Sequence, residues 1–390
     1  MRSSKTYDTF LALIRLGIGY ESCSLSQEIE WSAIKALADA HGLSAIVLDG
    51  LASFPFSRLE AYEMPQMLRL QWIGEVMQSY ETRYALYEKA IGSLAGFYNQ
   101  HGYKMMVLKG YACSLVWPNP KHRPCGDIDI YLFGRQKEAD KEMEVWFKVS
   151  SADVALARHS EQAPSTLALR NVQDSSFRID NSHHHHSVFK WQGFTVENHY
   201  DFMNVHHHKS NAEIEKIFKD LANDDRNFIQ IDGEKVYLPS ANLNALFLLR
   251  HAMAHFAAEQ ITIRHILDWA FFVKAHKREV DWGWLECLLD EFGMMPMYRI
   301  INAICVKDLG FDATLFTNTQ CDPVLKKRVL SEILSPEFSS SLPKEMERRV
   351  VYKYRRWKGN EWKRRLCFND SQRSLLWAGI KSHIMKPASI

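Results

Sequence analysis

Two aspartates, Asp127 and Asp129, are separated by a single isoleucine in the segment GDIDIYL, residues 126–132. The alternation of polar and apolar residues predicts a β-strand, in which every second side chain points to the same face. The two carboxylates are then close enough to share a cation, and a bound Mg²⁺ would relieve their mutual repulsion. Asp-x-Asp is also common on surface strands whose aspartates face water, so the neighbouring residues decide between the two interpretations.

Residues suited to binding phosphate lie before the aspartate pair. Lys109 and Gly110 occur where a short apolar run ends and a helical pattern begins, and free N–H groups at the start of a helix attract anions. Gly126 allows a tight turn just before the aspartates, and the guanidinium of Arg123 suits a phosphate. We therefore expect Lys109, Gly110, Arg123 and Gly126 to hold a metal-bound nucleoside triphosphate.

The segment LKGYACSLVWPNPKHRPCGDIDIYLFG, from Leu108 to Gly134, resembles an uncharacterised nucleotidyltransferase family of the LKG…R…GDID type that is abundant in bacteria. That family belongs to the nucleotidyltransferase superfamily related to DNA polymerase beta. The resemblance extends over most of the chain, and it implies an NTP such as ATP as substrate and Mg²⁺ or Mn²⁺ as cofactor. Tyr111 stands where the superfamily has a second small residue, and a bulky side chain there narrows the approach of the phosphates.

The resemblance also implies a third carboxylate on a later strand that faces the aspartate pair. Glu197 is the candidate, because the family has a glutamate followed two residues later by a histidine, here His199. Its implied role is metal ligand or general base for the acceptor hydroxyl. Asp201, on the same face by alternation, is the reserve candidate. The alternative for Glu197 is a buried ion pair with a basic residue.

Histidines are concentrated on both sides of the strand expected to carry the third carboxylate, at 183–186 and 206–208. They indicate either a polar loop beside the site or contacts to phosphate or acceptor by His185 or His186. Neither run has the ligand-pair spacing of a structural zinc site, and no cysteine is nearby.

Two further pairs are spaced four residues apart on helical patterns. His251 and His255 lack the glutamate of an HExxH zinc site, so packing histidines are expected. Arg264 and Asp268 predict an ion pair on a helix surface, with a place beside the nucleotide as the alternative.

The periodicity of apolar residues predicts an α+β protein with a small mixed-sheet nucleotidyltransferase core flanked by N-terminal and C-terminal helical regions. The expected parts are an N-terminal helical region (1–100), an α/β core (101–235) and a C-terminal helical region with a basic aromatic tail (236–390). The expected strands are 104–108, 127–133, 187–190 and 193–201, the last two joined by a Gln192–Gly193 turn, and the expected helices include 66–98, 111–117, 136–149, 212–221, 241–258, 263–276 and 282–292.

The overall composition is that of a folded protein that does not bind polyanions over its whole surface. Of the 390 residues, 46% are hydrophobic, which provides a core, and the net charge is only +2. The one clearly basic stretch, residues 348–365 (RRVVYKYRRWKGNEWKRR), predicts contact with an RNA acceptor or an anionic surface. The alternative is a solvated helix whose aromatic side chains pack on the body.

Cysteine usage and hydropathy bear on the compartment. The seven cysteines are scattered without CxxC pairs, which favours reduced thiols and a cytoplasmic location. The sequence contains no run of about 18 apolar residues, so we predict no transmembrane helix.

The resemblance implies transfer of an NMP group from an NTP to an acceptor hydroxyl, with release of pyrophosphate. Acceptor candidates are a small molecule, a protein side chain or an RNA end. The alternative is a catalytically silent nucleotide-binding or regulatory module of the same fold, in which Glu197 turns away from the aspartates or pairs with a base. A metal-dependent hydrolase would instead require His185, His186 or His251 to converge with carboxylates.

Overall fold

The computed structural model describes residues 4–20, 28–54, 64–157, 177–205, 209–338 and 345–371, together with residues 25, 62, 343, 375 and 377. Contacts within the chain group it into two compact units, each assembled from separate stretches of sequence. Unit 1 comprises Met1–Ala85, Cys113–Pro124 and Ala241–Asn369, and unit 2 comprises Leu86–Ala112, Cys125–Ser240 and Asp370–Ile390.

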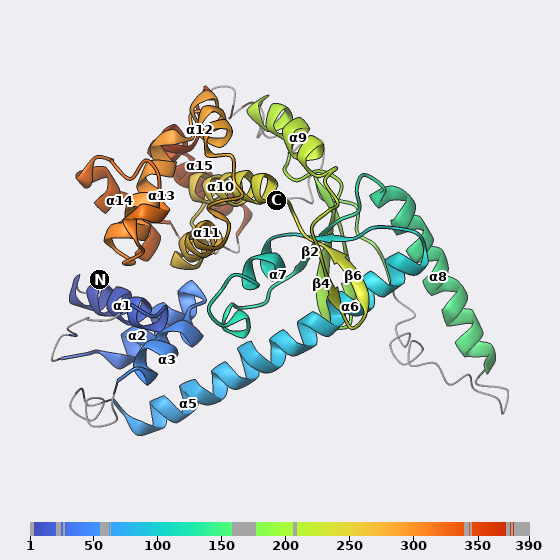
Figure 1. The fold of residues 1–390 in the computed structure, drawn as a ribbon, viewed down its shortest axis with the longest axis horizontal. Helices are drawn as coiled ribbons and strands as arrows, with labels where there is room; N and C mark the ends of the chain where they lie inside the picture. The colour runs from blue at the N-terminus through green and yellow to red at the C-terminus, as the bar shows by residue number, and fades with distance from the viewer. Residues whose placement is uncertain are drawn as a thin grey trace. The chain divides into compact units, whose positions relative to one another are not determined.

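Unit 2 is built on a mixed sheet (Figure 1). This sheet has six strands among the described residues, in the order β3-β4-β2-β1-β6-β5. β2 pairs in parallel with β4 and antiparallel with β1, and β1 pairs in parallel with β6. The predicted α+β fold with a small mixed sheet flanked by helices is therefore confirmed. The strands are β1 (Met106–Val107), β2 (Ile128–Tyr131), β3 (His186–Trp191), β4 (Phe194–His199), β5 (Phe228–Ile231) and β6 (Glu234–Tyr237).

Two tight hairpins contribute four of these strands. The predicted turn between β3 and β4 is present, with Gln192 and Gly193 both at positive φ (47° and 85°), as a two-residue hairpin turn requires. The β5–β6 hairpin turns at Asp232 and Gly233 (φ 51° and 86°). It was not among the predicted strands, although Asp-Gly is a typical hairpin signal.

Helices α6 and α8 cover one face of the sheet. The ring of Phe194 on β4 lies 5.2 Å from that of Tyr87 on α6, and Phe97 on α6 lies 5.4 Å from Trp146 on α8. Since side chains alternate along a strand, the residues between those of the covered face point to the opposite face, which we call the open face because α6 and α8 do not cover it. The helices that lie mainly in unit 2 are α6 (Arg83–Gln100), α7 (Lys109–Ser114), α8 (Gln136–Ala157) and α9 (Lys209–Leu221).

Unit 1 is helical in the part of the chain that the structure describes. The helices predicted at 241–258, 263–276 and 282–292 are confirmed to within one residue, because each carries a buried apolar face. No helix of the described residues is long and apolar enough to cross a membrane. The helices are α1 (Ser4–Gly17), α2 (Trp31–His41), α3 (Ser44–Ala52), α5 (Gln66–Val76), α10 (Ala241–Ala258), α11 (Ile263–His276), α12 (Trp282–Glu291), α13 (Met295–Lys307), α14 (Pro323–Leu334), α15 (Met346–Gly359) and α16 (Glu361–Cys367), with a π-helix at Met77–Thr82 and 3₁₀ turns at Pro120–His122 and Ala313–Leu315.

Candidate functional site

The register between β2 and β4 brings two acidic side chains together on the open face of the sheet. Asp129 on β2 is directly opposite Glu197 on β4, and facing residues of a parallel pair point to the same side. His199 follows Glu197 by two residues and shares this face. One side-chain ligand atom from each of Asp129, Glu197 and His199 lies within 4.8 Å of the other two.

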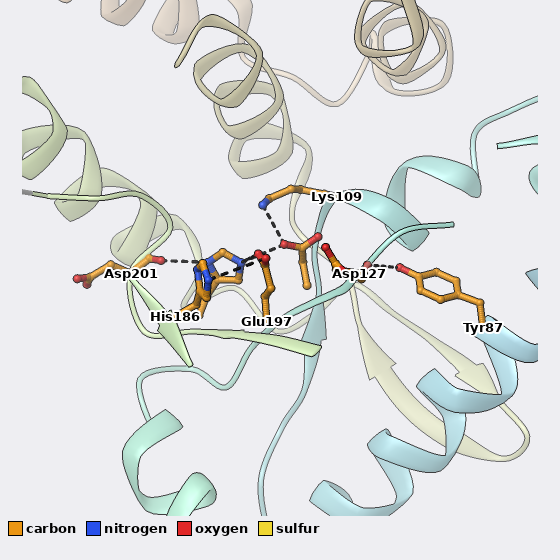
Figure 2. Close-up of polar contacts among 8 residues, drawn as sticks. Tyr87, Lys109, Asp127, His186, Glu197 and Asp201 are labelled. Atoms are coloured by element: carbon orange, nitrogen blue, oxygen red, sulfur yellow. Dashed lines mark hydrogen bonds and ion pairs between the residues drawn. The ribbon is translucent and has the colours of Figure 1, made fainter. Parts of the chain in front are cut away.

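Asp127 and Asp129 differ in their surroundings. Asp127 precedes the first residue of β2 and is exposed, whereas Asp129 lies within the strand and is buried. Partial desolvation of its carboxyl group and the negative charge of Glu197 raise the pKa of Asp127, while a hydrogen bond with Thr195 opposes the shift. Figure 2 shows Asp127, Lys109 and Glu197 gathered in one region.

Two cationic groups accompany the carboxylates. The ammonium of Lys109 donates to Oδ1 of Asp129 at 2.9 Å. Nε2 of His199 lies 3.1 Å from the same oxygen and 3.6 Å from Oε2 of Glu197. Burial disfavours ionisation of Asp129, but Lys109 and His199 together hold the pKa of this carboxyl well below its usual range. Three carboxylates against two cations leave the site with excess negative charge, which favours a metal ion.

A tyrosine from α6 fixes the backbone at Asp127. The Tyr87 hydroxyl donates to the main-chain oxygen of Asp127 at 2.8 Å (Figure 2). A Cβ added to Gly110 would lie 2.8 Å from the oxygen of that hydroxyl and 3.5 Å from the Asp127 carbonyl. Gly110 is therefore needed because the tyrosine and the backbone approach it closely. Sequence reasoning missed Tyr87, which lies more than 20 residues before the motif.

The backbone at Lys109 is strained. Lys109 has φ 28°, in the left-handed region that a lysine rarely adopts, and it is the first residue of the six-residue helix α7. Such a conformation costs about 1–3 kcal/mol and persists where the surroundings impose it, often at functional sites. The ion pair with Asp129 is one such constraint.

Tyr111 is held by α6. Its ring is buried and lies 6.2 Å from that of Tyr87, and its hydroxyl donates to Oε1 of Glu88 at 2.7 Å. The large residue at this position of the motif is thus accommodated by packing and a hydrogen bond. Whether it narrows the phosphate approach stays a prediction.

Arg123 and Gly126 have different surroundings from the other predicted phosphate ligands. Arg123 belongs to unit 1, where its guanidinium donates to both carboxylate oxygens of buried Asp268, at 2.8 and 3.0 Å. The predicted exposed pair of Asp268 with Arg264 is thus wrong, since Asp268 faces inward to Arg123 and to the Trp117 indole at 2.9 Å. A Cβ at Gly126 would meet no atom within 4 Å. Phosphate contacts by Arg123 and Gly126 stay predictions.

The histidine run 183–186 reaches the carboxylates from β3 and the residues before it. Side-chain ligand atoms of His185, His186 and His199 also lie within 4.8 Å of one another, and Nε2 of His186 is 3.9 Å from Oε1 of Glu197. Burial lowers the pKa of His186 to about 4, outweighing the attraction of Glu197. The Glu-x-His alternation on the strand was the sequence signal for His199 as part of the site.

Three further candidates, Asp201, His251 and His255, have contacts of their own. Asp201, the reserve candidate, follows β4 and forms an ion pair with Lys219 of α9. His251 and His255 lie on α10 in unit 1 with ring centroids 4.4 Å apart. The run 206–208 lies outside the described residues.

The basic segment, residues 348–365, spans most of α15 and α16. Lys363 is buried and ion-paired with Glu332 at 2.7 Å, and Trp362 packs edge-on against Phe256 at 5.8 Å. Part of its charge and aromatic surface therefore stabilises unit 1, in keeping with the alternative interpretation of a helix packed on the body. Contact of the remaining basic residues with RNA or an anionic surface stays a prediction.

Comparison with known protein families matches residues 27–309 to the family described as "Uncharacterised nucleotidyltransferase". The match covers well over half of the chain and contains every predicted site residue. No curated protein and no solved structure matches the chain. The chain therefore belongs to this family of uncharacterised nucleotidyltransferases.

Proposed function

We propose that the protein transfers an NMP group from an NTP to an acceptor hydroxyl, in a metal-dependent reaction that releases pyrophosphate. The observation that carries the proposal is the pairing of Asp129 with Glu197 across β2 and β4, with Lys109 bound to Asp129. Membership of a nucleotidyltransferase family supports the same reaction class. A silent module was expected to leave Glu197 turned away from the aspartates or paired with a base. The in-register pairing argues against the first arrangement, and the bases near Glu197 are His186 and His199, at 3.9 and 3.6 Å.

The donor set fits a hard divalent cation. Asp127, Asp129 and Glu197 supply carboxylate oxygens, the ligands that Mg²⁺ and Mn²⁺ prefer. Partial burial of Asp129 and Glu197 strengthens their interaction with a cation by excluding water. When bound, the metal neutralises charge on the triphosphate and on the attacking and leaving oxygens.

The protein's own residues orient the substrate and move the proton. In the proposed reaction Lys109 donates to a non-bridging phosphate oxygen and neutralises part of its charge. Glu197 accepts the proton of the acceptor hydroxyl as its oxygen bonds to the α-phosphorus, and the bond to the β-phosphate oxygen breaks. His199 positions Asp129 and Glu197 through its contacts to both carboxylates.

A metal-dependent hydrolase is the second candidate. Its supporting observation is the approach of His186 to Glu197 at 3.9 Å, which is the kind of convergence that such an enzyme requires, with His185 next to His186 and His199. Family membership favours transfer over hydrolysis. Transfer leaves the labelled phosphate on an acceptor, whereas hydrolysis leaves it in a free nucleotide.

The test is incubation of the purified chain with each α-labelled NTP, Mg²⁺ or Mn²⁺ and a cell extract. We expect label on an RNA, protein or small-molecule fraction, and the labelled fraction identifies the acceptor class. The Asp127→Asn/Asp129→Asn variant should transfer no label, whereas Asp290→Asn, the same change on the exposed face of α12, should transfer normally. Labelled NMP or NDP without any labelled acceptor supports the hydrolase. No turnover at all contradicts both candidates.

A further inference from the structure

Three imidazoles meet next to the carboxylate site. The ring centroids of His185 and His186 are 4.3 Å apart, and those of the same two rings lie 5.5 and 5.2 Å from His199. The ligand atoms of these three histidines lie within 4.8 Å of one another. β3 and β4 pair His186 directly with His199, so the sheet register itself places two of the three.

Two nitrogens of this cluster are buried without a partner. Nδ1 of His185 and Nδ1 of His186 make no hydrogen bond among the described residues, and the His186 side chain is only 8% exposed. Its Nε2 is 3.9 Å from Glu197, which is too long for a hydrogen bond. Buried polar atoms in proteins nearly always have a partner, so these two rings lack hydrogen bonds that buried imidazoles usually make, which favours a ligand within the cluster.

The third histidine presents Nε2 to the site, and binding of a metal would replace the contact of this nitrogen with Asp129. Nδ1 of His199 lies 3.2 Å from the main-chain oxygen of Asp201, while Nε2 faces the carboxylates of Glu197 and Asp129. A metal-bound histidine commonly donates its second N–H to a backbone carbonyl, which fixes the ring and its tautomer. The contact of His199 with Asp201 has this arrangement.

The spacing fits a small transition-metal ion. Ligands bound to tetrahedral zinc at about 2.0–2.1 Å lie about 3.3 Å from one another. Glu197 is 3.6 Å from Nε2 of His199 and 3.9 Å from Nε2 of His186. The ligand atoms of the three histidines lie within 4.8 Å of one another, so they would have to approach one another by up to about 1.5 Å to complete the coordination. Imidazole nitrogens suit zinc and its neighbours, whereas Mg²⁺ takes oxygen ligands.

We propose that His185, His186 and His199, with Glu197 as the fourth ligand, bind one divalent transition-metal ion of the zinc type beside the Asp127–Asp129 site. Glu197 and His199 then link the nitrogen-rich site to the carboxylates. The proposal concerns metal binding by the resting protein, and it does not depend on whether the protein transfers nucleotides.

Co²⁺ is the probe, because its visible absorption is strong in four- or five-coordinate sites and weak when it is octahedral. The full-length chain is stripped with a chelator and titrated with Co²⁺. We expect a strong visible band that saturates at one ion per chain, is displaced by stoichiometric Zn²⁺ and resists a large excess of Mg²⁺. A weak octahedral spectrum, or displacement by Mg²⁺, contradicts the proposal.

Variants assign the band to its ligands. His185→Gln and His186→Gln should each weaken Co²⁺ binding more than about 100-fold, beyond the loss caused by removing an outer-shell partner. His251→Gln/His255→Gln is the matched control, because it removes two histidines four residues apart on α10 and should leave the band unchanged. Unchanged circular dichroism of each variant excludes misfolding. Persistence of the band in His186→Gln, or its loss in the α10 control, overturns the assignment.

Asp127→Asn separates this proposal from nucleotidyl transfer. Asp127 is not in the nitrogen-rich cluster, so this variant should lose label transfer and keep the Co²⁺ band. If the native protein shows the band but transfers no label, only the proposed function fails. If it transfers label with Mg²⁺ and shows no band, only the nitrogen-rich site fails.

Discussion

The two faces of the same sheet surround a buried carboxylate with different partners, neutral donors on one face and cationic side chains on the other. On the covered face, Asp140 of α8 accepts hydrogen bonds from Ser187 at 2.6 Å and Asn198 at 2.8 Å, both neutral donors. On the open face, Asp129 takes its contacts from Lys109 and His199, both cationic. Ser187, Asn198 and His199 come from the adjacent strands β3 and β4, so alternation alone separates the two environments.

The pKa shifts of the two aspartates follow this difference. Burial raises the pKa of Asp140 even though its hydrogen bonds oppose the shift. For Asp129, the neighbouring cations outweigh burial and lower the pKa. A carboxylate held by neutral donors ties a helix to a sheet, whereas a carboxylate among cationic side chains stays ionised and can bind a metal ion. We therefore predict that Asp140 acts in stability and Asp129 in the reaction, and the following experiments test that prediction.

The largest effect is expected from Glu197→Gln on the open face. Loss of the negative charge should reduce the rate of label transfer at least about 100-fold, because the residue acts on the reacting atoms. Asp201→Asn, at the reserve carboxylate, is the matched control and should retain most of the rate. Single-turnover assays with the identified acceptor measure both. If Asp201→Asn is slow and Glu197→Gln is active, Asp201 and not Glu197 is the third carboxylate of the site.

A side chain at Gly110 should slow the reaction indirectly, because it would displace the Asp127 backbone that Tyr87 holds. In Gly110→Ala the new methyl group meets the Tyr87 hydroxyl at 2.8 Å, and displacement of the Asp127 backbone should slow transfer by about tenfold to a hundredfold. Adding Tyr87→Phe removes the clashing oxygen and should recover part of the rate. Gly74→Ala, where no atom lies within 4 Å, should leave activity unchanged. Equal rates for Gly110→Ala and Gly74→Ala would contradict the supporting role.

On the covered face, loss of the carboxylate of Asp140 should lower the stability of the fold. Asp140→Ala leaves the donors of Gln136, Ser187 and Asn198 without their acceptor, which should lower the free energy of unfolding by about 1–3 kcal/mol. Urea unfolding measures the change. Glu138→Ala, on the exposed side of the same helix, should change stability by less than about 0.5 kcal/mol. Similar losses for the two variants would remove the distinction between them.

The smallest expected effect is the change with pH in the stability that is lost when Asp140 is replaced. Because the folded-state pKa of Asp140 is raised above the unfolded value of about 3.9, its ionisation destabilises the fold as pH rises through the folded pKa. The stability lost in Asp140→Asn should therefore be larger near pH 4 than near pH 7. Urea unfolding of both proteins across this range tests the sign. A loss that grows toward neutral pH would mean that the folded-state pKa is lowered.

Local sequence patterns predicted much of the fold and part of the site. The β3–β4 hairpin with its Gln192–Gly193 turn and the helices α10 to α12 were expected, because turn residues and apolar periodicity act over short distances. The β5–β6 hairpin was missed despite its Asp232–Gly233 turn. The pairing partner of Asp268 was also missed, because an i, i+4 spacing suggests a neighbour on the same helix, and Arg123 lies far away in sequence.

By itself the sequence determined the family, the α+β class and the residue types available for chemistry, since these depend on motifs and local periodicity. The tertiary structure decided which distant side chains meet. Only the register of β2 with β4 places Asp129 opposite Glu197, and only the β3–β4 pairing brings His186 beside His199. A shift of one residue in either pairing would send these side chains to opposite faces of the sheet. The Gln192–Gly193 turn fixes the β3–β4 register locally, whereas β2 and β4 are far apart in sequence, and no local pattern encodes their register.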